Sequence, residues 1–267
     1  MASRHPKGLY VLFFTEMWER FGFYLLGALF VQYLTLHLKM SKAEATHIQG
    51  LYLMSVYLTP FVGVVFADRV YGYTRAVLTG AALLAAGYLL FAIQNKMAFY
   101  ASLGLLVLGN GLFKPNISTM VGKLYVQGDE RRDAGFTIFY MGINLGAMIS
   151  PFLTQILAQK VFGVESMPAY KIVFIVSGIG MLISLVWFWL GRGQLKGVGE
   201  APEGANGIGR VITVFVGAAV VIPVVYFLLA MGAAKLQVVL TIMFVLLAVM
   251  LLIEGVKNGA VARDKVI

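Results

Sequence analysis

Eight apolar segments follow one another along the chain, separated by short polar stretches. They cover about residues 9–36, 47–67, 74–94, 97–124, 133–159, 170–191, 210–231 and 236–255. As an α-helix rising about 1.5 Å per residue, each segment is long enough to cross a hydrocarbon core about 30 Å thick. The pattern therefore predicts an all-α membrane protein with eight spanning helices.

The composition agrees with this prediction and excludes several classes of protein. Hydrophobic residues make up 60% of the chain and charged residues 12%, which is more apolar surface than a water-soluble fold of this length can bury. The formal net charge is +9, but the basic residues are scattered singly, so the lipid bilayer is an expected partner and nucleic acid is not. Because the chain has no cysteine, disulfides, thiolate metal sites and cysteine nucleophiles are excluded.

Glycine and charge patterns divide the predicted helices into parts. The stretch 192–209 is rich in glycine and poor in large apolar residues, which indicates a flexible cytoplasmic linker. We therefore expect a six-helix bundle at 1–191, a helical hairpin at 210–256 and a cytoplasmic tail at 257–267. Most lysines and arginines between the segments fall on the side shared by both ends of the chain, which predicts that the N- and C-termini of this chain are cytoplasmic.

Three charged residues interrupt the first apolar segment. Glu16, Glu19 and Arg20 are spaced i, i+3 and i+4, so they share one face of a helix. A charge near the middle of a membrane helix costs about 2.5 to 3.5 kcal/mol, so we expect this face to contact a protein partner or a wet cavity. The alternative is a helix that begins later and lets the three side chains reach the cytoplasmic interface.

A lysine lies at a deformable point of the fourth segment. Lys114 precedes Pro115, which removes one backbone hydrogen bond, and glycines stand at positions 109 and 111. A buried lysine requires a carboxylate, so we expect Lys114 within ion-pair reach of Glu16 or Glu19. The alternative is a kinked helix whose lysine reaches the cytoplasmic face. Counted along the helices, several polar residues lie about 10 to 16 Å from the cytoplasmic end: Glu16, Glu19, Arg20, Tyr57, Lys114 and Asn144.

The junction of the second and third segments carries a cluster of charges and glycines. Its members are a carboxylate, two arginines and turn glycines: Gly63, Asp68, Arg69, Gly72 and Arg75. Such a cluster can latch helix ends together; the alternative is a positively charged cytoplasmic loop with an acidic end. No serine–histidine or metal-ligand set is present, and all three histidines lie outside the apolar cores, so neither an enzyme nor a metal site is expected.

Four ordered motifs carry a resemblance to a known family. They are the first-helix pattern of Glu16, Glu19 and Arg20, the loop pattern from Gly63 to Arg75, the run from Gly111 to Asn116, and the stretch from Asp133 to Gly146. The set resembles the proton-dependent oligopeptide transporter family of the major facilitator superfamily over about residues 9–191. The hairpin resembles the helix pair that bacterial members insert between their two six-helix halves. Two positions depart from many members: Phe23 replaces a tyrosine, and Gly27 replaces an arginine thought to contact the peptide carboxylate.

The resemblance implies the N-terminal six-helix bundle of the major facilitator fold plus the inserted hairpin, with a C-terminal six-helix half as the missing partner. It implies proton-coupled symport of di- and tripeptides by alternating access in the cell inner (plasma) membrane, driven by the proton gradient without a cofactor. Glu16 or Glu19 is then expected to carry the proton, and Lys114 to exchange between the glutamates and the peptide carboxylate. Peptide contacts are expected from Tyr24, Tyr57, Tyr140 and Asn144.

Two other functions stay open. One is a major facilitator carrier of another small anion, such as nitrate, which competition by di- and tripeptides would separate from a peptide carrier. The other is a non-transporting membrane scaffold subunit, which does not explain why four charges share one depth. The charges of Glu16, Glu19, Arg20 and Lys114 sum to zero, so one added proton leaves a cation free to take a carboxylate.

Overall fold

The computed structural model describes residues 5–157 and 169–200, together with the isolated positions 216, 238, 241, 242, 245 and 249. The side chains at positions 61, 62, 65, 69 and 70 fall outside the description. The chain divides into two compact units, Met1–Tyr226 and Phe227–Ile267. The helices described below all belong to the first unit.

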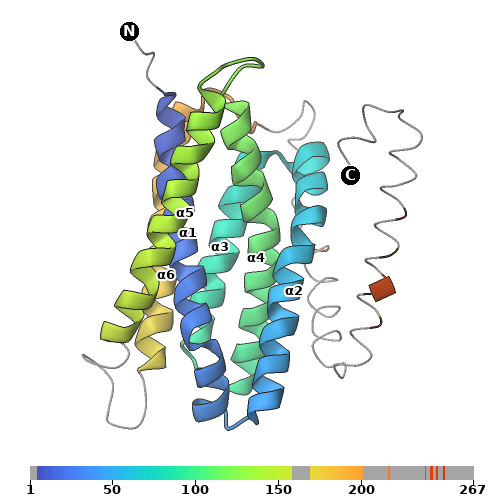
Figure 1. Cartoon of the computed structure of the whole chain (residues 1–267), viewed down its shortest axis with the longest axis vertical. Helices are drawn as coiled ribbons and strands as arrows, with labels where there is room; N and C mark the ends of the chain where they lie inside the picture. The colour runs from blue at the N-terminus through green and yellow to red at the C-terminus, as the bar shows by residue number, and fades with distance from the viewer. Residues whose placement is uncertain are drawn as a thin grey trace. The chain divides into compact units, whose positions relative to one another are not determined.

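Long α-helices make up the described part of the first unit. They are α1 (Lys7–Gln32), α2 (Lys42–Phe66), α3 (Tyr73–Phe91), α4 (Lys96–Lys123), α5 (Arg132–Gln155) and α6 (Tyr170–Gly191) (Figure 1). Short π-helical turns follow α1 at Tyr33–His37 and α2 at Ala67–Tyr71, and a 3₁₀ turn follows α6 at Arg192–Leu195. Within the described residues there is no β-strand.

These helices occupy the first six predicted ranges, and the prediction of an all-α membrane protein is confirmed. By length and composition alone, α3, α4, α5 and the stretch Tyr170–Leu195 qualify as membrane spans. The charges of Glu16, Glu19 and Arg20 fall in the middle of α1 and lower its hydropathy. Apart from isolated positions, the predicted spans 210–231 and 236–255 lie outside the described residues, so the hairpin and the division of the chain at 191 and 209 stay predictions.

Each helix of the first unit packs against particular neighbours. Helix α1 lies against α5 and α6, helix α3 lies against α4 and α6, and α2 lies against α4. Figure 1 shows the same order, with α1, α5 and α6 together at one side, α2 at the opposite side, and α3 and α4 between them. Helix α1 thus packs mainly on α5 and α6, and α4 mainly on α2 and α3, and the charged side chains of α1 are buried inside the first unit.

Glycines let the helices around α4 approach closely. A Cβ atom on Gly80 of α3 would lie 2.8 Å from the carbonyl oxygen of Gly109. A Cβ atom on Gly63 of α2 would overlap the carbonyl group of Gly111. Pro115 has no N–H to bond the carbonyl of Gly111 four residues earlier, so this carbonyl faces Gly63 instead of closing a turn of α4. Backbone contact of this kind requires glycine because any larger side chain would separate the helices.

The residues after α6 pack on the bundle. Leu195 is buried against α1 and the end of α4, where its Cδ2 atom would lie 3.0 Å from a Cβ atom on Gly8. The carbonyl oxygen of Gly199 accepts a 2.9 Å hydrogen bond from the backbone N–H of Thr74, which lies in the first turn of α3 and has no partner inside that helix. Residues 192–200, the described part of the predicted linker, thus form a structured strap across helix ends, whereas the linker over 192–209 as a whole stays a prediction.

Candidate functional site

The three charges of α1 form one buried cluster. Nε of Arg20 lies 3.0 Å from Oε1 of Glu16 and 2.5 Å from Oε2 of Glu19, and all three side chains are at most 3% exposed. The charges therefore lie inside the bundle and do not reach the interface. One guanidinium serves two carboxylates because Glu16 lies one turn before Arg20 and Glu19 lies next to it.

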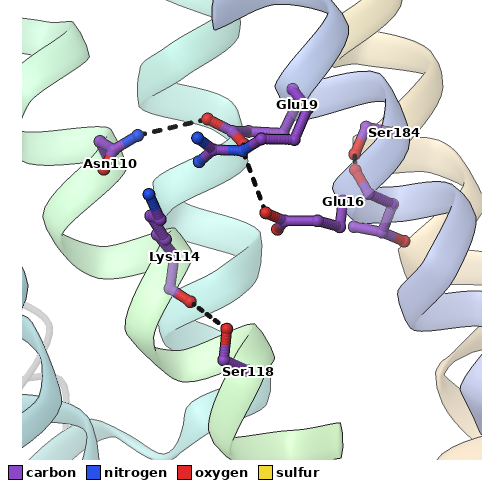
Figure 2. Close-up of polar contacts among 8 residues, drawn as sticks. Glu16, Glu19, Asn110, Lys114, Ser118 and Ser184 are labelled. Atoms are coloured by element: carbon purple, nitrogen blue, oxygen red, sulfur yellow. Dashed lines mark hydrogen bonds and ion pairs between the residues drawn. The ribbon is translucent and has the colours of Figure 1, made fainter. Parts of the chain in front are cut away.

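Helix α4 contributes an amide to this cluster. Nδ2 of Asn110 donates a 3.2 Å hydrogen bond to Oε1 of Glu19, as Figure 2 shows. Asn110 is 2% exposed and lies one turn before Lys114 on the same face of α4. Sequence reasoning missed Asn110, although its i, i+4 spacing from Lys114 could have indicated it.

Lys114 points from α4 toward the same carboxylates (Figure 2) but forms no ion pair within 4.0 Å with any described carboxylate. Its Nζ atom instead lies 5.4 Å from the centre of the Tyr57 ring, in cation–π range. The expected direct pair with Glu16 or Glu19 is therefore not formed in this structure. Arg20 instead holds one oxygen of each glutamate.

Several buried polar atoms of the cluster have neither a hydrogen-bond partner nor an ion-pair partner among the described residues. They are Oε2 of Glu16, Nη2 of Arg20 and Oδ1 of Asn110. Nearly all buried polar groups in proteins are paired, so these atoms represent free capacity for a proton, a water molecule or a polar ligand atom. Two carboxylates and two cations, with one cation outside the ion pairs, form a neutral group that can rearrange.

The residues expected to contact peptide are spread over three helices. Tyr57 of α2 is 60% exposed beside Lys114, and Tyr24 of α1 is 38% exposed beside Phe23. Tyr140 and Asn144 are exposed on α5 and make no hydrogen bond with the cluster within the described part of the chain. The structure thus brings Tyr57 to the site and leaves the α5 residues apart from it.

The two positions that depart from many family members both lie on α1 near the cluster. The Phe23 ring lies under the guanidinium of Arg20, with 5.0 Å between its centre and Cζ. Gly27 is exposed, and a Cβ atom there would meet nothing within 4 Å, so the space that a longer side chain would fill is open.

The predicted loop cluster lies at the junction of α2 and α3. Asp68 accepts a hydrogen bond from the Tyr73 hydroxyl, and Nζ of Lys123 lies 4.5 Å from the centre of the Tyr73 ring. Gly72 has φ 82°, a left-handed conformation that favours glycine. These contacts link the turn after α2, the start of α3 and the end of α4, and the role of the cluster as a latch stays a prediction. Gly63 is not part of this junction, because it lies within α2 and packs against Gly111 of α4. Arg75 is half-buried in the first turn of α3, and the Arg69 side chain lies outside the description.

The described residues contain no group of three or more histidine, aspartate or glutamate side chains placed to hold a metal ion. A family model described as the POT family matches residues 74–251, which is more than half of the chain. The chain belongs to the POT family. The match confirms the resemblance to this family.

Relatives of this POT-family chain are known in several bacteria. The chain is 40% identical over 200 residues to the uncharacterized transporter YclF of Bacillus subtilis (strain 168), covering 73% of this chain and 39% of that protein. It is 39% identical over 195 residues to a di-/tripeptide transporter of Lactococcus lactis subsp. lactis (strain IL1403), covering 70% of this chain and 38% of the relative. The chain thus spans about two fifths of the length of the curated relatives it matches.

Solved structures of POT-family proteins share the fold. A peptide transporter POT in complex with alafosfalin superimposes with a TM-score of 0.74 and 35% identity, over 92% of this chain and 51% of that one. A POT family transporter in complex with 5-aminolevulinic acid gives a TM-score of 0.76 and 32% identity, over 92% and 52%. A bacterial homologue of the drug peptide transporters PepT1 and PepT2 gives 0.82 and 28%, over 94% and 57%. The protein is therefore a multi-pass membrane protein, and the family is one of transporters and not of enzymes.

Proposed function

We propose that this chain forms the N-terminal half of a proton-coupled symporter that takes up di- and tripeptides by alternating access. The names of its relatives support peptide as the substrate class. The observation that carries the proposal is the neutral cluster of Glu16, Glu19, Arg20 and Lys114, in which Lys114 points at the carboxylates without pairing with them.

The chemistry follows from charge balance. A proton that binds Glu16 or Glu19 removes one negative charge, so the cluster then holds two cations and one carboxylate. A cation buried without a counter-ion is costly, and the C-terminal carboxylate of a peptide restores neutrality. Nη2 of Arg20 and Nζ of Lys114 are the donors without ion-pair partners among the described residues. Proton binding thereby raises the affinity for a peptide, which is the basis of symport.

Exposed polar side chains of α1, α2 and α5 supply the remaining contacts in this proposal. Tyr57 lies closest to Lys114, and Tyr24, Tyr140 and Asn144 are exposed on α1 and α5. Tyrosine hydroxyls and an asparagine amide can bond the peptide backbone without selecting its side chains. The open space at Gly27 leaves the carboxylate to Arg20 and Lys114, because no arginine stands there to share it.

A second six-helix half completes the transporter in this proposal. It would cover the face on which Tyr57, Tyr140 and Asn144 are exposed, and rocking of the two halves would open the site to each side of the inner membrane in turn. The loops that carry Arg69, Arg75, Arg131 and Arg192 would face the cytoplasm, as would both ends of this chain.

The proposal is tested by transport in proteoliposomes that contain this chain together with the second half of the Lactococcus lactis relative. An inward proton gradient should drive accumulation of labelled dialanine, and unlabelled di- and tripeptides should compete with it. Competition by nitrate in place of peptides would indicate the anion carrier. Peptide transport with no response to the proton gradient would overturn coupling through the cluster. Assembly with the second half without transport of either substrate class would favour the scaffold.

A further inference from the structure

The two carboxylates of the cluster have different surroundings. Oε1 of Glu19 accepts a hydrogen bond from the amide of Asn110, and its Oε2 atom lies in ion-pair range of Nε of Arg20 without a hydrogen bond among the described residues. Glu16 has only its Oε1 atom near Arg20, and its Oε2 atom is buried without a hydrogen-bond partner among the described residues. The amide of Asn110 is therefore what distinguishes the two sites.

An amide N–H group discriminates between the two forms of a carboxyl group. An ionised carboxylate only accepts hydrogen bonds and accepts them strongly, whereas a protonated acid has one oxygen converted into a donor. A donor held against Glu19 therefore stabilises its ionised form, and the free oxygen of Glu16 can take a proton without breaking a hydrogen bond. We propose that Asn110 is a positioning residue that keeps Glu19 ionised, so that the coupling proton binds Glu16.

The packing of α4 fixes the amide in place. Gly109 lies against α3, where a Cβ atom would be 2.8 Å from the Leu84 side chain, and Gly111 lies against Thr59 of α2 at the same distance. Thr59 also donates a 3.1 Å hydrogen bond to the carbonyl of Val107. The backbone on both sides of Asn110 is thus clamped between two helices, so the amide cannot follow Glu19 if that side chain moves.

The other titratable groups around the two glutamates do not replace this donor. Tyr52 of α2 and Tyr88 of α3 interact electrostatically with Glu19, and Lys114 of α4 interacts with both carboxylates. Within the described residues, Asn110 is nevertheless the side chain that hydrogen-bonds Glu19 through an uncharged donor. Unlike Lys114, an amide carries no charge that would have to be balanced during the transport cycle.

The inference is tested by infrared titration of the carboxyl groups in this chain, reconstituted in nanodiscs without peptide. Difference spectra between each variant and the wild type cancel the exposed carboxyl groups. Glu16→Gln should remove the buried carboxyl band, whereas Glu19→Gln should keep it and move its midpoint to lower pH, because Arg20 then serves Glu16 alone. Asn110→Leu and Asn110→Ala both remove the hydrogen-bond donor to Glu19, so Glu19 should titrate as a second buried carboxyl group. The midpoint of the buried carboxyl band should then rise by about one pH unit.

Asn116→Leu is the matched control. Asn116 is a buried asparagine of the same helix, and its amide bonds two backbone carbonyls, of Leu112 at 2.6 Å and of Gly63 at 3.4 Å, and no carboxylate. The control variant should titrate like the wild type. Loss of the band in Glu19→Gln, or a wild-type titration in a folded Asn110 variant, would overturn the assignment. The inference deepens the proposed function, but the titration needs neither peptide nor second half. Failed peptide uptake with the expected titration would therefore contradict the proposed function alone.

Discussion

Arg20 is the residue on which the buried cluster depends, because it forms ion pairs with two carboxylates at once. Replacing it with alanine would leave Glu16 and Glu19 buried without a counter-ion, which costs about 3 to 5 kcal/mol. We expect Arg20→Ala to lower the thermal stability of the chain in detergent sharply. Arg192→Ala is the control, since Arg192 is exposed at the end of α6 beside Trp189. Equal stability of the two variants would contradict the paired arrangement.

Asp129, in the loop before α5, offers a pH test outside the membrane helices. Hydrogen bonds from the Arg131 side chain, 2.9 Å from Nε and 2.6 Å from Nη2, lower the pKa of Asp129 to about 2. A carboxylate with a lowered pKa contributes its full stabilisation at pH values above its ordinary pKa of 3.8. This contribution is lost as the pH falls through about 2. Asp129→Asn should therefore leave the pH profile of peptide uptake unchanged between about pH 5 and 8. A displaced profile would assign part of the coupling to this loop.

Sequence reasoning found the charged members of the site and missed its uncharged one. Glu16, Glu19, Arg20 and Lys114 stand out because a charge is rare inside an apolar segment. Asn110 stands in a glycine-rich stretch where an amide has no such contrast. The pairing inside the cluster could not be predicted either, because the choice between Arg20 and Lys114 as partner depends on side-chain directions and not on spacing.

At the scale of elements, close contact between α2 and α4 rests on Gly63. A methyl group there would meet the carbonyl of Gly111, so we expect Gly63→Ala to destabilise the chain by about 1 to 3 kcal/mol through separation of the helices. Gly27→Ala provides the control in a helix position with nothing within 4 Å, where alanine should stabilise by up to about 1 kcal/mol. Thermal unfolding in detergent measures both. A neutral or stabilising Gly63→Ala would show that the two helices do not depend on this contact.

The strap after α6 gives a second test of packing. Leu195 is 1% exposed between α1 and the end of α4, so Leu195→Ala should cost about 2 to 5 kcal/mol. Leu190→Ala, with the same side chain 69% exposed, should change the stability by less than about 0.5 kcal/mol. If the two substitutions had the same small effect, the strap would not be part of the folded unit.

Helix positions followed from hydropathy, whereas helix ends depended on local hydrogen bonds. Helix α2 begins at Lys42, before its apolar segment, because the Ser41 hydroxyl accepts a 3.2 Å hydrogen bond from the N–H of Glu44. For the strap, glycine content predicts a flexible linker, because glycine gives the chain conformational freedom. Two of its glycines, Gly197 and Gly199, have positive φ angles of 79° and 89°, so they form its turns instead.

At the scale of the whole molecule, the described helices leave several polar groups exposed. Tyr57, Tyr140 and Asn144 would meet lipid if nothing covered them, which is unfavourable for polar groups in a membrane. This explains why we propose a second half as partner. Alternating access requires two halves that rock against each other, so this chain alone should not concentrate dipeptides in liposomes. Accumulation by the purified chain as a monomer would contradict the two-half mechanism.

The central claim is that proton binding at the buried cluster drives peptide uptake. The most direct test compares Glu16→Gln with the wild type in proteoliposomes that contain both halves, using labelled dialanine under an inward proton gradient and in exchange without a gradient. We predict that the variant loses gradient-driven accumulation and keeps exchange, because exchange moves no net proton. Gradient-driven accumulation at the wild-type level in Glu16→Gln would contradict the account.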